Sequence, residues 1–434
     1  MKKSAKNSEL SWGAYKRLAE KYQANPGDSR FQELLEDEKS RYQKQYQELI
    51  AGVRAYMSKK CSLDKIADPR FKLWFQRQDA RNKFQSSIIR HMEGLYYIPV
   101  AFELTDGCSV GCDFCCLAAK SLRSIYRYTP EHGREWQQIL SATREILGDF
   151  AGAGICYFAT EPFDNPDYEK FLGDFRDLLG YVPQTTTAAA DRDTARTKAF
   201  LKMLGNEELS HAAVRFSIVS LEQLEKIHRA FPEEELYCVE LLLNNPESGN
   251  CYSRSGRARQ LSEEMAEKGF LDTASSICTN GFVINMARHT VMLMTARRPN
   301  ERYPLGMKVL EKRSFDDAGG YQKALLELIE KWMPKDMPED KPMRLADYIT
   351  YEQSGYRLKI QGDKISRTVT VGETEQEGFR RLFEENMSVR EILCSLDLTE
   401  YEKKRFLKNV KLFYESGYLE ERREDDGVES GKNQ

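Results

Sequence analysis

Long apolar runs are missing from this sequence of 434 residues. Nowhere do about 18 uncharged apolar residues follow one another, which is near the least that a membrane-spanning helix needs, and the basic first residues have no apolar segment behind them. A large excess of one charge is missing too, since the formal net charge of -3 is far from the basic balance of nucleic-acid-binding proteins. We therefore expect a folded, cytoplasmic protein without membrane or nucleic-acid partners.

Disulfide-rich character is also absent, because ten cysteines in a chain of this length fall far below the density of disulfide scaffolds. The five histidines are scattered and are not paired in the sequence. Three cysteines, however, fall within eight residues, at Cys108, Cys112 and Cys115. This grouping indicates metal or redox chemistry in a reducing compartment.

The chain before residue 96 has a helical pattern. Between residues 31 and 56, apolar residues recur mostly three or four positions apart among Glu, Lys and Gln. This spacing is typical of an amphipathic helix. We predict a mostly helical N-terminal extension over residues 1–95.

Residues 96–320 alternate between two patterns after a strand-like run at 97–104. Helix-period stretches and apolar runs follow one another, the helices at 135–150, 168–179, 194–204 and 221–231 and the runs at 154–159, 181–189, 213–219 and 236–243. Such alternation predicts an α/β fold with a parallel sheet, either open or closed into a full or partial barrel. A closing hairpin is expected at 282–286 and 289–294.

Residues 321–421 have a different order of elements. Two strands, at 356–360 and 366–371, precede three helix-like stretches at 375–385, 389–396 and 400–414. Two strands and three helices in about 80 residues suit a small winged-helix domain. The charged tail at 422–434 is expected to be disordered.

The cysteine motif itself is Cys-x3-Cys-x2-Cys, directly after the first predicted strand. Thiolates are the normal ligands of iron–sulfur clusters, which usually take four of them, so three protein ligands leave one iron open. A zinc site would normally close with a fourth Cys or His at short spacing, and only the adjacent Cys116 follows. We therefore predict one [4Fe-4S] cluster on Cys108, Cys112 and Cys115.

With these residues the chain resembles the radical S-adenosylmethionine superfamily. In that family an aromatic residue, here Phe114, precedes the third cysteine and packs beside adenine. The segment at 157–163 resembles the family's Gly-Gly-Glu-Pro motif, with Ala159 and Thr160 in place of the glycines, and Glu161 corresponds to the acid that contacts the methionine amino group. The resemblance implies a partial (β/α)6 barrel that binds S-adenosyl-L-methionine on the open iron.

Other candidates come from strand ends, where ligands collect in such folds. Thr187, Ser217 and Arg257 are predicted to help bind the cofactor, although polar residues at strand ends also commonly cap helices. Cys156 and Cys238 lie inside apolar strands and are expected to be core thiols.

A closer resemblance extends from about residue 96 to the end. The segments FELTDGCSVGCDFC, FATEPFDNPDYE, SGRAR and RYPLG resemble the proteusin-type peptide epimerases, which convert residues of a ribosomally made precursor from L to D. The resemblance implies α-hydrogen abstraction by a 5′-deoxyadenosyl radical and return of hydrogen from the opposite face by a cysteine thiol. It also implies an electron donor such as flavodoxin or ferredoxin, and a C-terminal domain that binds the precursor's leader as an added strand.

The hydrogen donor does not follow directly from the resemblance. The family resemblance implies a cysteine shortly before the RYPLG segment, but residues 295–301 contain no thiol. Cys278 is therefore our candidate donor, with Cys251 as the alternative. Two other functions stay open: a different radical modification, such as cross-linking or bond cleavage, and a non-catalytic peptide-binding partner.

Overall fold

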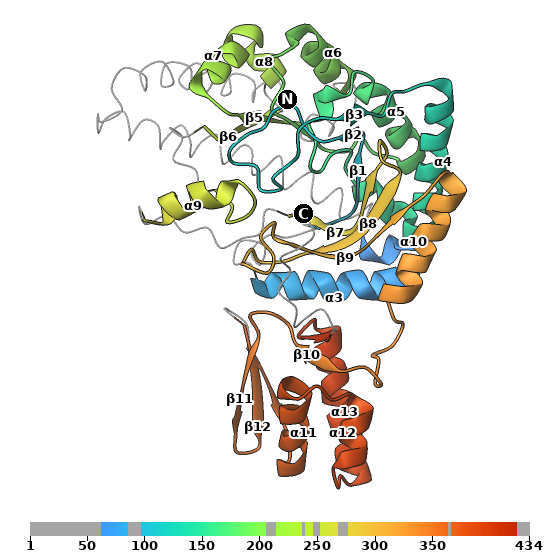
Figure 1. Ribbon diagram of the computed structural model, residues 1–434, viewed down its shortest axis with the longest axis vertical. Coiled ribbons are helices and arrows are strands. Elements are labelled where there is room, and N and C mark those ends of the chain that lie inside the picture. The colour runs from blue at the N-terminus through green and yellow to red at the C-terminus, as the bar shows by residue number, and fades with distance from the viewer. Residues whose placement is uncertain are drawn as a thin grey trace, which may run out of the picture.

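The computed structural model describes residues 62–85, 97–204, 214–236, 239–245, 252–267, 277–362 and 366–422. The helix predicted at 31–56 and the tail after residue 422 lie outside these ranges, as do Cys238 and Cys251. Within them the chain is a mixed α/β protein with two separate apolar clusters, one drawn from residues 66–333 and one from residues 343–419 (Figure 1). No helix of the described part is both long and apolar enough to cross a bilayer.

The first sheet contains the strand that leads into the cysteine motif. β1 (Ile98–Glu103) pairs in parallel with β7 (Thr279–Asn285), and β8 (Thr290–Ala296) and β9 (Met307–Ser314) continue the sheet in antiparallel order. The predicted hairpin is thus confirmed as β7 and β8, but among the described residues it closes no barrel. β9 was not predicted, because half of its residues are charged and its apolar signal is weak.

The second sheet is parallel and contains β4 (Thr185–Thr187), β5 (Val214–Ile218) and β6 (Val239–Leu243). Helices alternate with these strands from β4 onward, as the sequence predicted, with α6 (Thr194–Leu204) before β5 and α7 (Leu221–Ala230) and the short α8 (Glu233–Leu236) before β6. α4 (Pro130–Leu147) and α5 (Tyr168–Leu179) both precede β4, with no strand between them. The apolar run at 154–159 makes only one parallel bridge, between Ile155 and Ala101 of β1. Among the described residues the two sheets therefore do not close into a barrel.

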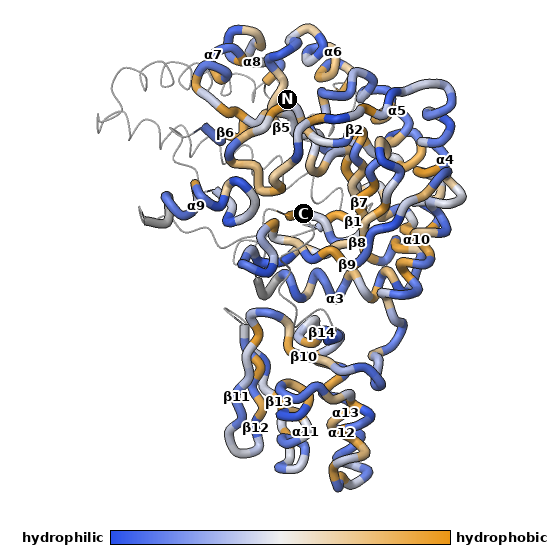
Figure 2. Tube along the Cα trace, in the orientation of Figure 1, coloured by the Kyte–Doolittle hydropathy of each residue, from blue (hydrophilic) through white to orange (hydrophobic). Residues whose placement is uncertain are grey.

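The first apolar cluster extends beyond the predicted boundaries. α3 (Pro69–Gln85) lies inside the predicted N-terminal extension, yet it buries Phe71 against Phe282 of β7 with ring centroids 5.6 Å apart. α10 (Ala318–Trp332) buries Leu325 and Leu328 in the same cluster. Apolar residues are frequent along β1, β7 and α10 (Figure 2). The two apolar clusters therefore separate between residues 333 and 343.

Residues 343–421, which we call the C-terminal module, enclose the second cluster. Its elements are β10 (Met343–Leu345) paired with β14 (Leu419–Glu421), the antiparallel sheet β11 (Thr350–Ser354), β12 (Arg357–Gln361) and β13 (Ser366–Thr370), and the helices α11 (Glu373–Glu384), α12 (Val389–Ser395) and α13 (Glu400–Glu415). The two strands and three helices predicted here are present. β11 was missed because its five residues include one apolar side chain, Tyr351.

Candidate functional site

The cysteine motif forms a closed loop after β1. β2 (Thr105–Asp106) pairs with β3 (Ser124–Ile125), and the Cys108 amide donates to the Lys120 carbonyl at 2.8 Å. We call residues 107–119 between these contacts the cysteine loop. Gly107 begins it with a φ of 93°, and a β-carbon there would lie 2.3 Å from the Ser121 carbonyl oxygen. Only glycine can make this entry without moving the backbone.

The three thiols of the motif, on Cys108, Cys112 and Cys115, are half-buried and interact with one another, and the adjacent Cys116 is half-buried too. A hydrogen bond between the side chains of Cys112 and Cys115 raises the pKa of Cys112 and lowers that of Cys115 to about 5. The Val110 amide lies 3.4 Å from the Cys108 sulfur and the Ala119 amide 3.4 Å from the Cys115 sulfur. Amides near sulfur favour the thiolate, the form that binds iron, but at Cys108 burial outweighs them and raises the pKa.

Whether these residues suit a cluster depends on the kind of metal centre. In the described part of the chain, no three His, Cys, Asp or Glu side chains surround one point closely enough to hold a single ion. A four-iron cluster makes a different demand, because each cysteine binds a different iron. Three neighbouring thiols that do not converge on one point are therefore compatible with a cluster.

Arg257 holds the cysteine loop through its backbone. Its amide donates to the Cys115 carbonyl at 2.9 Å, its Nε to the Cys112 carbonyl at 3.0 Å and its Nη1 to the Ala119 carbonyl at 2.9 Å. Gly256 has a φ of 57°, and a β-carbon there would lie 2.6 Å from the Cys115 oxygen. The cofactor role of Arg257 stays a prediction, and the contacts found position the loop, ahead of α9 (Ala258–Glu267).

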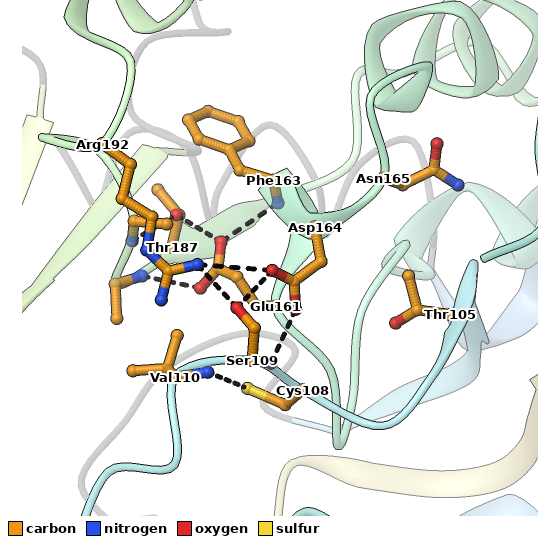
Figure 3. Close-up of polar contacts among 12 residues, drawn as sticks. Thr105, Cys108, Ser109, Val110, Glu161, Phe163, Asp164, Asn165, Thr187 and Arg192 are labelled. Atoms are coloured by element: carbon orange, nitrogen blue, oxygen red, sulfur yellow. Dashed lines mark hydrogen bonds and ion pairs between the residues drawn. The ribbon is translucent and has the colours of Figure 1, made fainter. Parts of the chain in front are cut away.

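Glu161 is buried beside the loop and both of its oxygens accept hydrogen bonds (Figure 3). Oε1 accepts from the Phe163 amide at 3.0 Å and from Thr187 Oγ1 at 2.5 Å, and Oε2 accepts from the Ala188 amide at 2.9 Å. Burial raises the pKa of Glu161, against these donors. A carboxylate has about four acceptor positions, two on each oxygen. Oε1 uses both of its positions and Oε2 uses one, so Oε2 retains one acceptor position among the described residues. Thr187 therefore orients Glu161.

Asp164 ties the loop to two other segments. It ends the short 3-10 helix η4 (Pro162–Asp164), and its Oδ2 accepts from the Ser109 amide at 2.8 Å while its Oδ1 accepts from Ser109 Oγ at 2.5 Å. Arg192, after β4, donates to Ser109 Oγ at 2.6 Å and lies 3.4 Å from Asp164 Oδ1 (Figure 3). Sequence reasoning missed both residues. The position of Asp164 three residues after Glu161 was the available signal.

A second buried acid positions the segment before Glu161. Glu103, the last residue of β1, is buried, and burial raises its pKa. Its Oε1 accepts from the Ala159 amide at 2.8 Å and its Oε2 from Asn285 Nδ2 at 2.9 Å. One side chain thereby connects β1, β7 and the Gly-Gly-Glu-Pro-like segment. The sequence analysis did not identify Glu103, because a single polar residue in an apolar strand gives no separate signal.

Phe114 lies beside an aromatic residue that the sequence did not single out. Its ring faces Tyr252 with centroids 6.5 Å apart and an interplanar angle of 22°. Tyr252 is buried and donates from its hydroxyl to the Asn244 carbonyl at 3.1 Å. The predicted adenine-side residue is thus part of an aromatic pair at the loop.

Ser217 and Thr187 lie on opposite faces of the β4–β6 sheet. Thr186 is in register with Arg215 of β5, and Arg215 is in register with Glu240 of β6. The Arg215 Nε lies 2.5 Å from Glu240 Oε2. Because side chains alternate along a strand, Ser217 shares this polar face and Thr187 does not. The structure therefore does not bring the two predicted cofactor residues together.

Cys278 lies at the other end of the first sheet from the cysteine loop. Its carbonyl accepts from the Ile98 amide at 2.8 Å at the start of β1, whereas the loop follows the end of β1. Burial raises the pKa of Cys278, and the nearby Arg215 opposes that shift. Cys156 is buried in the first apolar cluster, as predicted for a core thiol.

No protein-family model matches the chain, and no solved structure matches it. The chain is 33% identical over 293 residues to a protein of Sinorhizobium fredii (strain NBRC 101917 / NGR234) that carries the description "Uncharacterized protein y4wI". The match covers 66% of this chain and spans 56% of that protein's length.

Proposed function

We propose that this protein is a radical S-adenosylmethionine enzyme that modifies a ribosomally made precursor peptide, most readily by L-to-D epimerisation. One observation carries the proposal: the cysteine loop presents three neighbouring thiols while Arg257 binds the backbone of that same loop. A structural zinc site would require a fourth ligand at short spacing, and the sequence offers only the adjacent Cys116.

The chain's own residues suggest how the cofactors would be held. Cys108, Cys112 and Cys115 would bind the [4Fe-4S] cluster, and the remaining acceptor position of Glu161 would receive the ammonium group of S-adenosyl-L-methionine. Phe114 would lie along the adenine ring. When bound, the two cofactors would supply a 5′-deoxyadenosyl radical. In this proposal the β1–β7 pair belongs to a partial (β/α)6 barrel that is more open than the sequence predicted.

The C-terminal module supports peptide binding because it has an unpaired strand edge. Val371 donates to Tyr356 across the β12–β13 pair at 3.0 Å, and hydrogen-bonded pairs alternate in antiparallel sheets. Thr368 and Thr370 of β13 therefore point their backbone groups away from β12, and no strand of the described chain covers that edge. A leader would add there as a strand of a winged-helix-type domain.

Thr368→Pro tests this edge, since it removes one outward N–H and leaves the β12 ladder intact. We expect leader affinity to fall about tenfold, the effect of one to two lost hydrogen bonds. Gln353→Pro, at an outward position of the opposite edge strand β11, is the control, and its fold is checked separately because it also loses the hydrogen bond from Gln353 Nε2 to the Gln376 carbonyl. Equal losses in both variants would remove β13 as the leader site.

The position of Cys278 supports a second candidate reaction, cross-linking or side-chain cleavage. Epimerisation needs a donor on the side of the carbon opposite the radical, and Cys278 lies at the far end of the β1–β7 pair from the loop. A cross-link or side-chain cleavage needs no thiol donor. Cys278→Ala separates the two, because an epimerase variant would still form 5′-deoxyadenosine but no D-residues.

The main test combines iron analysis with product analysis. Anaerobically reconstituted protein should bind about four irons and cleave S-adenosyl-L-methionine when reduced, and the triple Cys108, Cys112, Cys115→Ala variant should do neither. Cys394→Ala, an exposed thiol of α12, is the control. With a co-expressed precursor in deuterated water, epimerisation adds one deuterium per inverted residue. An active, iron-free triple variant would refute the proposal.

A further inference from the structure

A cavity of about 60 Å³ lies apart from the cysteine loop, where α3, β8 and β9 meet α13 and β14. In Figure 1, α3 lies between the β7–β9 sheet and the C-terminal module, so the cavity is at the junction of the two apolar clusters. Its charged lining consists of Arg77, Arg81, Arg297, Lys308, Glu420 and Glu421. The space holds several water molecules or one small ion.

The lining carries more positive than negative charge. Four cationic side chains face two carboxylates, an excess of two positive charges. Glu420 is shared by three arginines, at 2.6 Å from Arg297, 2.5 Å from Arg344 and 3.5 Å from Arg81. Although burial opposes it, these cations hold the pKa of Glu420 far below its ordinary range. Glu420 is thus already ion-paired, and Glu421 pairs outward with Lys341 at 3.0 Å.

Arg297 has donors without acceptors. Its side chain is 2% exposed, and its Nη2 donates to Glu420. Its Nε and Nη1 are buried and have no hydrogen-bond partner among the described residues. Burial, with the neighbouring charge of Arg297, lowers the pKa of Arg81 to about 9. An unpaired buried guanidinium is costly, so its environment calls for an acceptor.

We propose that this cavity binds a small, doubly charged oxyanion of the phosphate or sulfate type. Such an ion supplies acceptor oxygens for Arg297 and balances the two-charge excess of the lining. Bound there, the ion would also connect the C-terminal module to α3. The two already pack closely, because a β-carbon on Gly417 (φ 76°) would lie 2.6 Å from the Arg77 carbonyl oxygen. The inference does not depend on the proposed radical chemistry.

Thermal unfolding of the full chain in inorganic phosphate, at constant ionic strength set with chloride, tests the site. We expect a saturable rise of the unfolding midpoint, as for any ligand that binds only the folded state. Arg297→Gln should abolish this rise. Lys308→Gln, a milder change, should weaken phosphate binding about tenfold, and Glu421→Gln should strengthen it by removing a negative charge from the lining. Arg229→Gln, which removes a 76% exposed guanidinium on α7, is the control.

The responses to different anions and in the variants distinguish a bound doubly charged oxyanion from water. Sulfate and phosphate acting alike, with acetate weaker, support a doubly charged ion, whereas an equal response to acetate overturns that assignment. A response that does not saturate, or one that Lys308→Gln and Arg297→Gln both retain, shows that water fills the cavity and overturns the site. Because the readout is stability, failure here leaves the iron and cofactor tests unaffected.

Discussion

The cysteine loop and the C-terminal module are held in place by different means. The loop is tied by polar contacts to residues far along the chain, among them Asp164 and Arg257. The module surrounds its own aromatic cluster, in which Phe379 meets Phe406 at 4.8 Å and Phe413 at 5.7 Å. Hydrogen bonds are directional but each contributes only about 0.5–1.5 kcal/mol. We infer that damage to the loop removes geometry first and damage to the module removes stability first.

The largest stability effect should come from the module. Phe379→Ala deletes a fully buried ring and should lower the free energy of unfolding by about 3–5 kcal/mol, measured by urea denaturation. Tyr401→Ala, a 69% exposed ring of α13, should change it by less than about 0.5 kcal/mol. Iron binding should persist in both variants. Loss of iron in Phe379→Ala alone would mean that the two regions are not independent.

Gly256→Ala should affect iron binding more than the stability of the fold. The added β-carbon would lie 2.4 Å from the Cys116 oxygen, and the left-handed backbone costs a non-glycine residue about 1–2 kcal/mol. We expect most of the bound iron to be lost after reconstitution, with a smaller change in unfolding than for Phe379→Ala. Gly173→Ala, where the added carbon meets no neighbouring atom within 4 Å inside α5, should keep its iron and gain about 0.5–1 kcal/mol.

Asp164→Asn should have an intermediate effect. The amide can keep one bond from Ser109 but loses the charge that faces Arg192. Unfolding should change by about 1 kcal/mol, and 5′-deoxyadenosine formation should fall severalfold while iron content is kept. Asp149→Asn, a 54% exposed partner of Arg144, should leave formation unchanged. Unaltered formation in Asp164→Asn would show that this contact does not position the loop.

The smallest effects concern two carboxylates with similarly low pKa values. Despite the opposing effect of burial, Arg127 and Lys170 hold the pKa of Asp167 at about 2, and Arg380 and Arg381 do the same for Glu377 on α11. Both groups are more acidic in the folded state, so their stabilisation is present above about pH 4 and is lost as the pH falls through about 2.

Added salt should distinguish the two carboxylates. Asp167 is 11% exposed and Glu377 35%, and exposed pairs are screened more strongly. The free energy of unfolding of Asp167→Asn and Glu377→Gln is compared with that of the parent protein by urea denaturation at pH 7, with increasing salt. We expect the loss of stability in Glu377→Gln, which starts below about 1 kcal/mol, to disappear at lower salt than the loss in Asp167→Asn. The opposite order would mean that the pairs of Asp167 are the more solvated ones.

Sequence patterns predicted the elements of both regions better than their contacts. Four helices between residues 130 and 231 and the β7–β8 hairpin follow directly from apolar periodicity, because that signal is local. The run at 154–159 was predicted as a full strand, but it forms one bridge at Ile155. A glycine-rich 3-10 helix, η3 (Gly148–Ala153), comes directly before this run, and periodicity does not count backbone hydrogen bonds.

By itself, the sequence determined the spacing of Cys108, Cys112 and Cys115, the alternation of strands and helices, and the apolar cluster of the C-terminal module, since each depends on residues close together in the chain. Only the tertiary structure decided that Arg257 binds the cysteine loop and that Arg297 meets Glu420, 123 residues later, in a buried cavity. Charged side chains carry no periodic signal of burial. Their roles depend on which distant groups share their low-dielectric surroundings, and folding alone brings those groups together.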